Sequence, residues 1–158
     1  KAESKWHVSG NLAMTVEAIT TGKTCETAVA LLIVRNAKGM PLHTFVAATE
    51  NVAMLAKDHR TDGQTMAQAL AEWIKLESNT RKPDFLLPWA EGQNEPPMKE
   101  GEEFPFTVSS DISRETYEAA RKSGNKLFCF VQGMESESCL TAADADTVTE
   151  IGIQSFPG

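Results

Sequence analysis

Side chains able to do acid–base or metal chemistry are scattered in this sequence rather than clustered. The three histidines, His7, His43 and His59, show neither the His-x-His nor the His-x-x-x-His spacing that lets two imidazoles share a metal. His59 follows Asp58 in a polar connector, where an imidazole is able to act as a general base. A small hydrolase with its site near Asp58 and His59 is therefore one hypothesis, and a solvated loop histidine is the simpler interpretation. His43 is expected on the solvated side of a strand.

Two short motifs resemble ligand-binding signatures but fail on spacing. Residues 22–24 read Gly-Lys-Thr, the end of a phosphate-binding loop, but the glycine required five residues earlier is Glu17. Asp144 and Asp146 with Glu150 resemble part of a calcium loop, but the obligatory glycine is absent and the glutamate comes too early. We interpret these residues as a turn and an acidic turn, and the sequence predicts no metal and no cofactor.

The cysteines point to one disulfide and an exported protein. Cys25, Cys129 and Cys139 form no Cys-x-x-Cys pair, which argues against thioredoxin-like and zinc-ribbon sites. If residues 133–135 form a hairpin turn, Cys129 and Cys139 lie opposite each other and are able to form a bridge. A second interpretation is that Cys129 is a buried apolar residue, and a third is that Cys25 pairs with one of the other two cysteines. The chain begins at Lys1, as expected if an export signal has been removed or a longer chain trimmed, so we expect a periplasmic or secreted protein.

Residues 78–105 stand out because they hold five of the seven prolines and show no helical or strand period. Loops of this length are uncommon in compact domains and are usually functional or disordered. Within them, residues 83–105, here called the acidic segment, carry six acids against one base, a net charge of −5. The acids are Asp84, Glu91, Glu95, Glu100, Glu102 and Glu103.

The acidic segment is the best candidate binding surface in the sequence. It begins with the apolar stretch that contains Phe85 and Trp89. These aromatic side chains could anchor a partner while the five glutamates steer a cationic one toward them. The other interpretation is that residues 85–89 fold back over an edge of the sheet and leave the acids merely solvated.

Composition narrows the class of partner. The formal net charge is −7 and the pI about 5.0, which argues against nucleic acid and anionic membranes. The longest apolar run is seven residues, far below the ~20 of a membrane span. We therefore expect a non-enzymatic exported binding domain, with a cationic protein as its partner. A hydrolase such as lysozyme is one specific possible partner. A different class of function for this chain is that of a structural module in an envelope assembly.

The strands are predicted from alternation and turn chemistry. Residues 28–34 form the longest apolar run and are expected to be a strand buried on both faces. Asn36 to Gly39 supplies a turn into a partner strand at residues 42–46. Residues 12–19 alternate as a half-buried strand, and residues 126–132 predict another, with its aromatic side chains on one face. Two further strands are expected at residues 136–141 and 147–156.

Three helices complete the prediction, at residues 50–56, 65–76 and 113–122. Thr65 with Gln68 matches a capping box, and Ser113 is placed to cap the third helix. Residues 1–8 are expected to be frayed. Two groups of strands separated by helices predict a single α+β domain over residues 1–158, with a largely antiparallel sheet and two or three helices packed on it. Residues 28–34, 42–46 and 127–131 are expected at the centre of that sheet.

Overall fold

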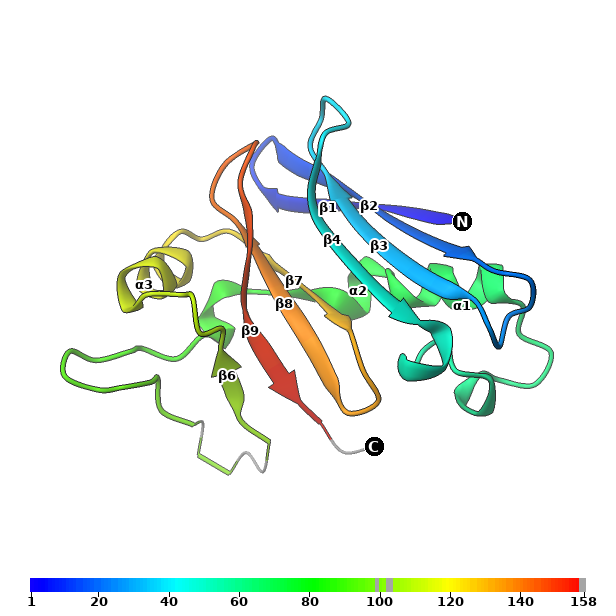
Figure 1. Ribbon diagram of the computed structural model, residues 1–158. Coiled ribbons are helices and arrows are strands. Elements are labelled where there is room, and N and C mark those ends of the chain that lie inside the picture. The colour runs from blue at the N-terminus through cyan, green and yellow to red at the C-terminus, as the bar shows by residue number, and fades with distance from the viewer. Residues whose placement is uncertain (99, 102–103, 157–158) are drawn as a thin grey trace.

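The computed structural model describes residues 1–98, 100–101 and 104–156, and these form two antiparallel sheets (Figure 1). The first sheet has the strand order β1-β2-β3-β4 and the second has the order β5-β7-β8-β9-β6. The first-sheet strands are β1 (Ala2–Ser9), β2 (Leu12–Thr21), β3 (Val29–Arg35) and β4 (Pro41–Ala48). The second-sheet strands are β5 (Thr80–Arg81), β6 (Phe106–Val108), β7 (Leu127–Val131), β8 (Ser136–Ala142) and β9 (Val148–Ser155).

Short helices connect and cover these sheets. The α-helices are α1 (Met66–Trp73), α2 (Leu76–Asn79) and α3 (Arg114–Lys122). The 3-10 turns are η1 (Thr49–Asn51), η2 (Lys57–His59) and η3 (Pro83–Phe85). The α+β class and the largely antiparallel pairing are confirmed. The central strands, however, are divided between the sheets, because β7 pairs with β5 and β8 and not with β3 or β4.

The hairpin β3–β4 is present, but β3 is not buried on both faces. Gly39 closes the turn with φ of +81°, the conformation that favours glycine. Alternate β3 residues such as Leu32 are fully buried, whereas Val29 on the opposite face is 37% exposed. The sequence did not predict this open face, because an unbroken apolar run shows no alternation between apolar and polar residues. His43 on β4 is also corrected: its ring packs edge-on against Phe130 and its Nε2 is buried.

The larger core lies between the inner face of the first sheet and one face of the second. The expectation of frayed residues 1–8 is wrong, because this stretch forms the edge strand β1 with Trp6 and Val8 fully buried. The indole Nε1 of Trp6 donates a hydrogen bond to the carbonyl oxygen of Lys126 at 3.1 Å, which ties β1 to the start of β7. The charged residues of the stretch alternate to the outer face and conceal this strand from a simple composition argument.

The smaller core covers the other face of the second sheet. It contains Leu127 and Cys129 of β7, Ile151 of β9, Tyr117 of α3 and Leu86 of the acidic segment. The second sheet is thus buried on both faces, with the first sheet on one side and α3 with the acidic segment on the other (Figure 1).

The helix predictions hold for two of the three segments. Thr65 and Gln68 form the expected capping box of α1, and Ser113 caps α3 through the Thr116 N–H. Residues 50–56 are not an α-helix but contain the 3-10 turn η1. The hydroxyl of Thr49 donates to backbone carbonyl oxygens of the loop before β3, including that of Cys25 at 2.7 Å. Residues 78–105 include the short elements β5 and η3, which their composition did not predict.

Candidate functional site

The apolar end of the acidic segment is packed against α3 and β6. Leu86 is only 2% exposed and belongs to the smaller core. The rings of Phe85 and Phe106 meet edge-to-face with centroids 5.5 Å apart, and those of Trp89 and Tyr117 do so at 5.6 Å. Of the predicted binding residues, Phe85 and Trp89 therefore serve at least in part to fix the segment to the fold.

Hydrogen bonds fix the backbone of the same stretch. The backbone N–H of Trp89 donates to the Glu118 carboxylate at 2.8 Å, and the Tyr117 hydroxyl donates to the Leu87 carbonyl oxygen at 2.8 Å. The Arg121 guanidinium and the Trp89 N–H together hold the pKa of Glu118 at about 2, because both donate to its ionised form. Burial raises the pKa of Tyr117 to about 12, so its hydroxyl remains a donor at physiological pH.

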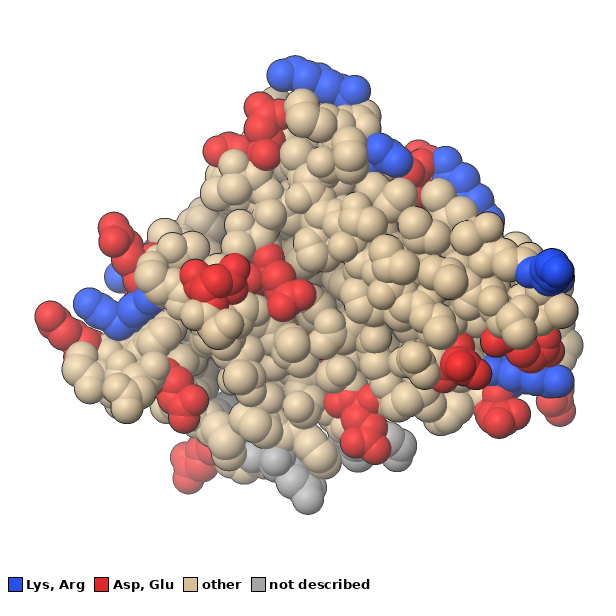
Figure 2. All heavy atoms as spheres, viewed as in Figure 1, with Lys and Arg blue, Asp and Glu red and all other residues tan. Residues whose placement is uncertain are grey.

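The described acids of the segment are exposed to solvent. Asp84, Glu91, Glu95 and Glu100 are all exposed, and the predicted residues Glu102 and Glu103 lie outside the described residues. Figure 1 shows that the segment projects from the second sheet below α3, and Figure 2 shows acidic side chains over that part of the surface. The structure thus presents exposed carboxylates on a loop that is attached through its aromatic side chains.

A recess of about 100 Å³ lies between the segment and the second sheet. The residues that line it are Asp84, Phe85, Leu87, Pro96, Pro97, Met98, Phe106, Tyr117 and Gln154. The amide Nε2 of Gln154 donates to a backbone carbonyl at 2.7 Å. Its Oε1 is buried and has no hydrogen-bond partner in the described part of the chain. The lining of the recess is therefore mostly apolar, with Asp84 as its exposed acid.

One glycine holds the Phe106 wall in place. A Cβ added at Gly152 of β9 would lie 2.5 Å from Cζ of Phe106 and would overlap the backbone oxygen of Thr107. Only a residue without a side chain allows β6 and its phenyl ring to approach β9 this closely. Gly152 is thus a requirement of the recess that the sequence alone did not single out.

Comparison with known proteins adds no family. The chain matches no protein-family model, no curated protein and no solved structure. In the described residues no helix has the length and apolarity needed to cross a membrane. The function is therefore inferred from residues and geometry alone.

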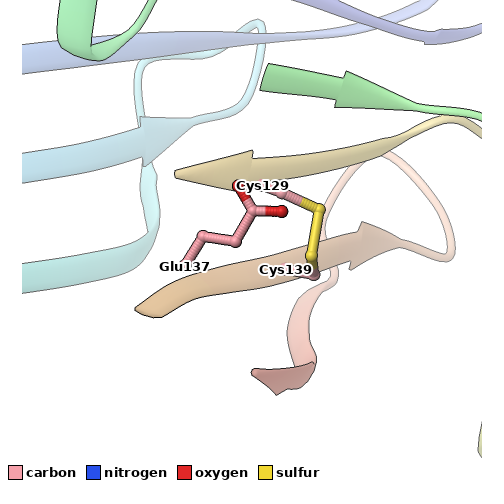
Figure 3. A group of neighbouring side chains, drawn as sticks. All are labelled: Cys129, Glu137 and Cys139. Carbon is pink, nitrogen blue, oxygen red and sulfur yellow. A yellow bond between two sulfur atoms is a disulfide. The ribbon is translucent and has the colours of Figure 1, made fainter. Parts of the chain in front are cut away.

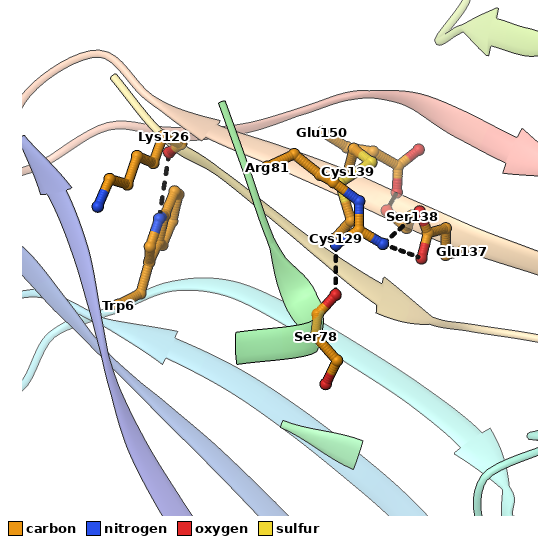
Figure 4. Close-up of a disulfide and its surroundings, with 9 residues drawn as sticks. All are labelled: Trp6, Ser78, Arg81, Lys126, Cys129, Glu137, Ser138, Cys139 and Glu150. Carbon is orange, nitrogen blue, oxygen red and sulfur yellow. Dashed lines mark hydrogen bonds and ion pairs between the residues drawn. A yellow bond between two sulfur atoms is a disulfide. The ribbon is translucent and has the colours of Figure 1, made fainter. Parts of the chain in front are cut away.

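The expected disulfide is present in the smaller core. Cys129 on β7 and Cys139 on β8 are directly paired residues, with Cα atoms 4.0 Å apart, and both are fully buried. Figure 4 shows the bridge between the strands, with the hydrogen bond from Ser138 to Glu150 beside it. Cys25 is free and exposed. The bridge thus braces the sheet on the side that carries α3 and the acidic segment.

Glu137 lies next to this disulfide (Figure 3). Burial raises the pKa of its carboxyl group, and the Arg81 guanidinium at 3.4 Å opposes that rise. The donor atoms of Glu137, Cys129 and Cys139 lie within 4.8 Å of one another, the one such group within the described ranges. Both sulfurs are bonded to each other, so neither is a thiolate able to bind a metal. We interpret Glu137 and Arg81 as an ion pair that tethers β5 to β8.

A second hollow, of about 310 Å³, lies between the loop before β3 and the turns after β4. It brings Asp58 and His59, the residues of the hydrolase hypothesis, together with the free thiol of Cys25. In the described structure no hydrogen bond joins any two of these three side chains. A nucleophile and base need that contact, and a base needs an orienting partner, so the hollow holds the residue types without the arrangement.

The carboxylates of the residues that resembled a calcium loop serve separate interactions. The carboxylate of Asp144 accepts a hydrogen bond from the Asp146 N–H at 2.9 Å and closes the turn. Asp146 accepts one from the Asn36 amide at 2.8 Å, which links the β8–β9 turn to the β3–β4 turn. Glu150 turns to the buried hydroxyl of Ser138.

Four residues of the site were not anticipated from the sequence: Phe106, Tyr117, Glu118 and Gln154. The spacing of Glu118 with Arg121 predicts an ion pair on one helix face, and that signal was available. No local pattern marks Phe106 or Gln154, because each acquires its role only when β6 pairs with β9.

Proposed function

We propose that this protein is a non-enzymatic, exported binding module whose acidic segment recognises a cationic protein. One observation carries the proposal: exposed carboxylates are presented on a segment whose aromatic end is fixed to α3 and β6. The disulfide between Cys129 and Cys139 supports the exported location, because such bonds persist in oxidising compartments.

An acidic segment anchored at its aromatic end is suited to binding for two reasons. Association orders loops and side chains at an entropic cost, and a segment already held by Leu86, Trp89 and Glu118 avoids part of it. Clustered carboxylates also raise the rate of encounter with a cationic surface, an effect that salt screens. A basic hydrolase such as lysozyme presents a cationic surface of this kind and is therefore a suitable first probe.

The proposal is tested by changing Glu91, Glu95, Glu100, Glu102 and Glu103 to Gln together and measuring affinity for lysozyme and for cytochrome c by calorimetry. The matched control changes five exposed glutamates elsewhere to Gln and removes the same charge: Glu50, Glu72, Glu77, Glu115 and Glu135. We expect the segment variant to lose at least about tenfold in affinity, and to lose the salt dependence of binding, while the control binds like the wild type. Equal losses in both variants, or no binding of either basic protein by the wild type, would refute the proposal.

A second candidate function is hydrolysis in the hollow that Cys25 shares with Asp58 and His59. The observation that favours this candidate is that the fold brings Cys25 and His59, which lie in separate loops, to the same hollow. Replacing His59 with Ala separates the candidates: a hydrolase loses turnover of an ester substrate, whereas the affinity of a binding module for lysozyme is unchanged.

A further inference from the structure

The outer face of the first sheet, which points away from the second sheet, carries aliphatic side chains that belong to neither core of the described chain. The inner face of the same sheet packs in the larger core, and both faces of the second sheet are buried. We propose that the outer face packs against the same face of a second copy of this chain, so that the protein forms a two-fold symmetric dimer. The aliphatic residues of the face are Ile19, Val29, Leu31, Ile33 and Val46.

These side chains form one continuous patch because the strands hold them in register. Ile19 on β2 pairs with Leu31 on β3, and Leu31 pairs with Val46 on β4, which makes a row across three strands. Val29 and Ile33 lie two residues to either side of Leu31 and therefore on the same face. Val46 is 57% exposed and Val29 is 37% exposed. Contiguous apolar side chains on a surface mark an interaction site, whereas single exposed ones do not.

The charges on the outer face are nearly balanced, although the whole chain carries a net charge of −7. Two acids, Glu3 and Glu17, and the bases Lys5 and Arg35 lie on this face of β1, β2 and β3. Glu17 is neutralised in place, because its carboxylate pairs with Lys1 at 2.6 Å and with Arg35 at 2.7 Å.

The strongly acidic part of the molecule lies elsewhere. Figure 2 shows a broad surface without charged side chains over β3 and β4, and Figure 1 shows the acidic segment on the far side of the molecule, beyond the second sheet. Two copies that meet through the outer faces therefore keep their acidic segments apart, which reduces the repulsion that their net charges would otherwise cause. This distribution of charge favours a second copy at this face.

The size and shape of the face also suit a second copy. Four strands about 4.8 Å apart, each with roughly eight residues at about 3.3 Å, give a face of about 500 Å². Two such faces bury about 1,000 Å² together, the lower limit of specific interfaces, so we expect a dimer that dissociates on dilution. Sheets pack face to face with interdigitating side chains, and a two-fold axis brings the apolar centre of one copy onto that of the other.

Analytical ultracentrifugation of the full chain, over a wide range of concentrations, tests the dimer. We expect the mean mass to rise from the 17.2 kDa of one chain toward twice that value. Val46→Lys should weaken the association at least about tenfold, because each dimer then receives two like charges within an apolar contact. Met134→Lys is the matched control, since Met134 is a 37% exposed residue of the β7–β8 turn and should leave the association unchanged. Neither side chain belongs to a core, so both variants should fold.

Methyl NMR of the same samples identifies the contact. We expect the signals of Ile19, Leu31 and Ile33 to shift with protein concentration, and the signal of Ile151 in the smaller core to stay constant. A single chain at every concentration, shifts confined to other surfaces, or full association of Val46→Lys would overturn the dimer. If the wild type stays monomeric but sediments with phosphatidylcholine vesicles, the face binds lipid and the dimer is refuted. The inference does not depend on the proposed function, because the acidic segment is not part of this face.

Discussion

The two faces of the second sheet are covered in different ways. One face, with Phe128, Phe130 and Leu140, packs against the first sheet in a core that also contains two buried tryptophans. The other face, with Leu127 and the disulfide, packs under α3 and the acidic segment. The first covering is a hydrogen-bonded sheet, whereas the second is mostly a segment without regular structure, held by aromatic contacts and a few hydrogen bonds.

This difference indicates how the molecule combines stability with a surface free to carry charge. The larger core is made of apolar side chains on two rigid sheets, where packing supplies most of the stabilisation. The smaller core adds a covalent bridge and the ionised acceptor Glu118, which hold a segment that could not bury enough apolar surface alone. The candidate binding site therefore lies on the side whose structure depends most on specific polar and covalent links.

Leu140→Ala and Leu127→Ala test the comparison with the largest expected effects. Both leucines are fully buried in the same sheet and face opposite cores. We expect Leu140→Ala to lower the free energy of unfolding by about 4–5 kcal/mol and Leu127→Ala by about 2–3 kcal/mol. The acidic segment is able to move into the cavity that Leu127→Ala leaves, whereas the two sheets around Leu140 are not able to close theirs. Urea denaturation of both variants measures this, and equal losses would show that the two coverings are equally rigid.

Removal of the disulfide tests the covalent contribution to the smaller core. The double variant Cys129→Ala with Cys139→Ala releases a link between residues ten apart, and loop closure of that size is worth about 2–3 kcal/mol. Cys25→Ser is the control, because Cys25 is exposed and free, and its stability should equal that of the wild type. A double variant as stable as the Cys25→Ser control would mean that the bridge does not support this face.

Local patterns predicted the elements, and the pairing of distant elements decided the rest. The sequence predicted the features that depend on residues close together in the chain. These are the helix caps at Thr65 and Ser113, the turn at Gly39 and the pairing of Cys129 with Cys139. The division into two sheets could not be predicted, because a buried strand such as β7 would have the same composition in either sheet.

The same limit applies to the candidate site. The acids and aromatic residues of the segment were predicted from composition, and their union with Gln154 and Phe106 was not. The prediction that residues 1–8 are frayed was wrong for a related reason. Their charged side chains indicated an exposed segment, whereas Trp6 and Val8 point alternately into the larger core. A burial that depends on a partner strand elsewhere in the chain leaves only a weak period-2 signal in eight residues.

Glu118→Gln tests the polar attachment of the segment and has the smallest expected effect. The carboxylate of Glu118 accepts the backbone N–H of Trp89 and pairs with Arg121, and its pKa is about 2 against an ordinary value of 4.5. The pair is partly exposed to solvent, so we expect a loss of about 1 kcal/mol in the free energy of unfolding. Hydrogen exchange at the Trp89 amide should become faster, because its acceptor loses its charge.

The pH dependence gives this prediction its sign. A carboxyl group whose pKa is lowered in the folded state stabilises the protein fully above its ordinary pKa, and that stabilisation is lost as pH falls through the lowered value. The difference in unfolding free energy between wild type and Glu118→Gln should therefore be constant above pH 5 and shrink between about pH 4.5 and pH 2. Glu91→Gln, an exposed change in the same segment, is the control and should leave the free energy of unfolding at pH 7 unchanged. If Glu118→Gln is as stable as this control, the carboxylate of Glu118 does not help to hold the segment, and the contrast between the two faces reduces to packing and the disulfide.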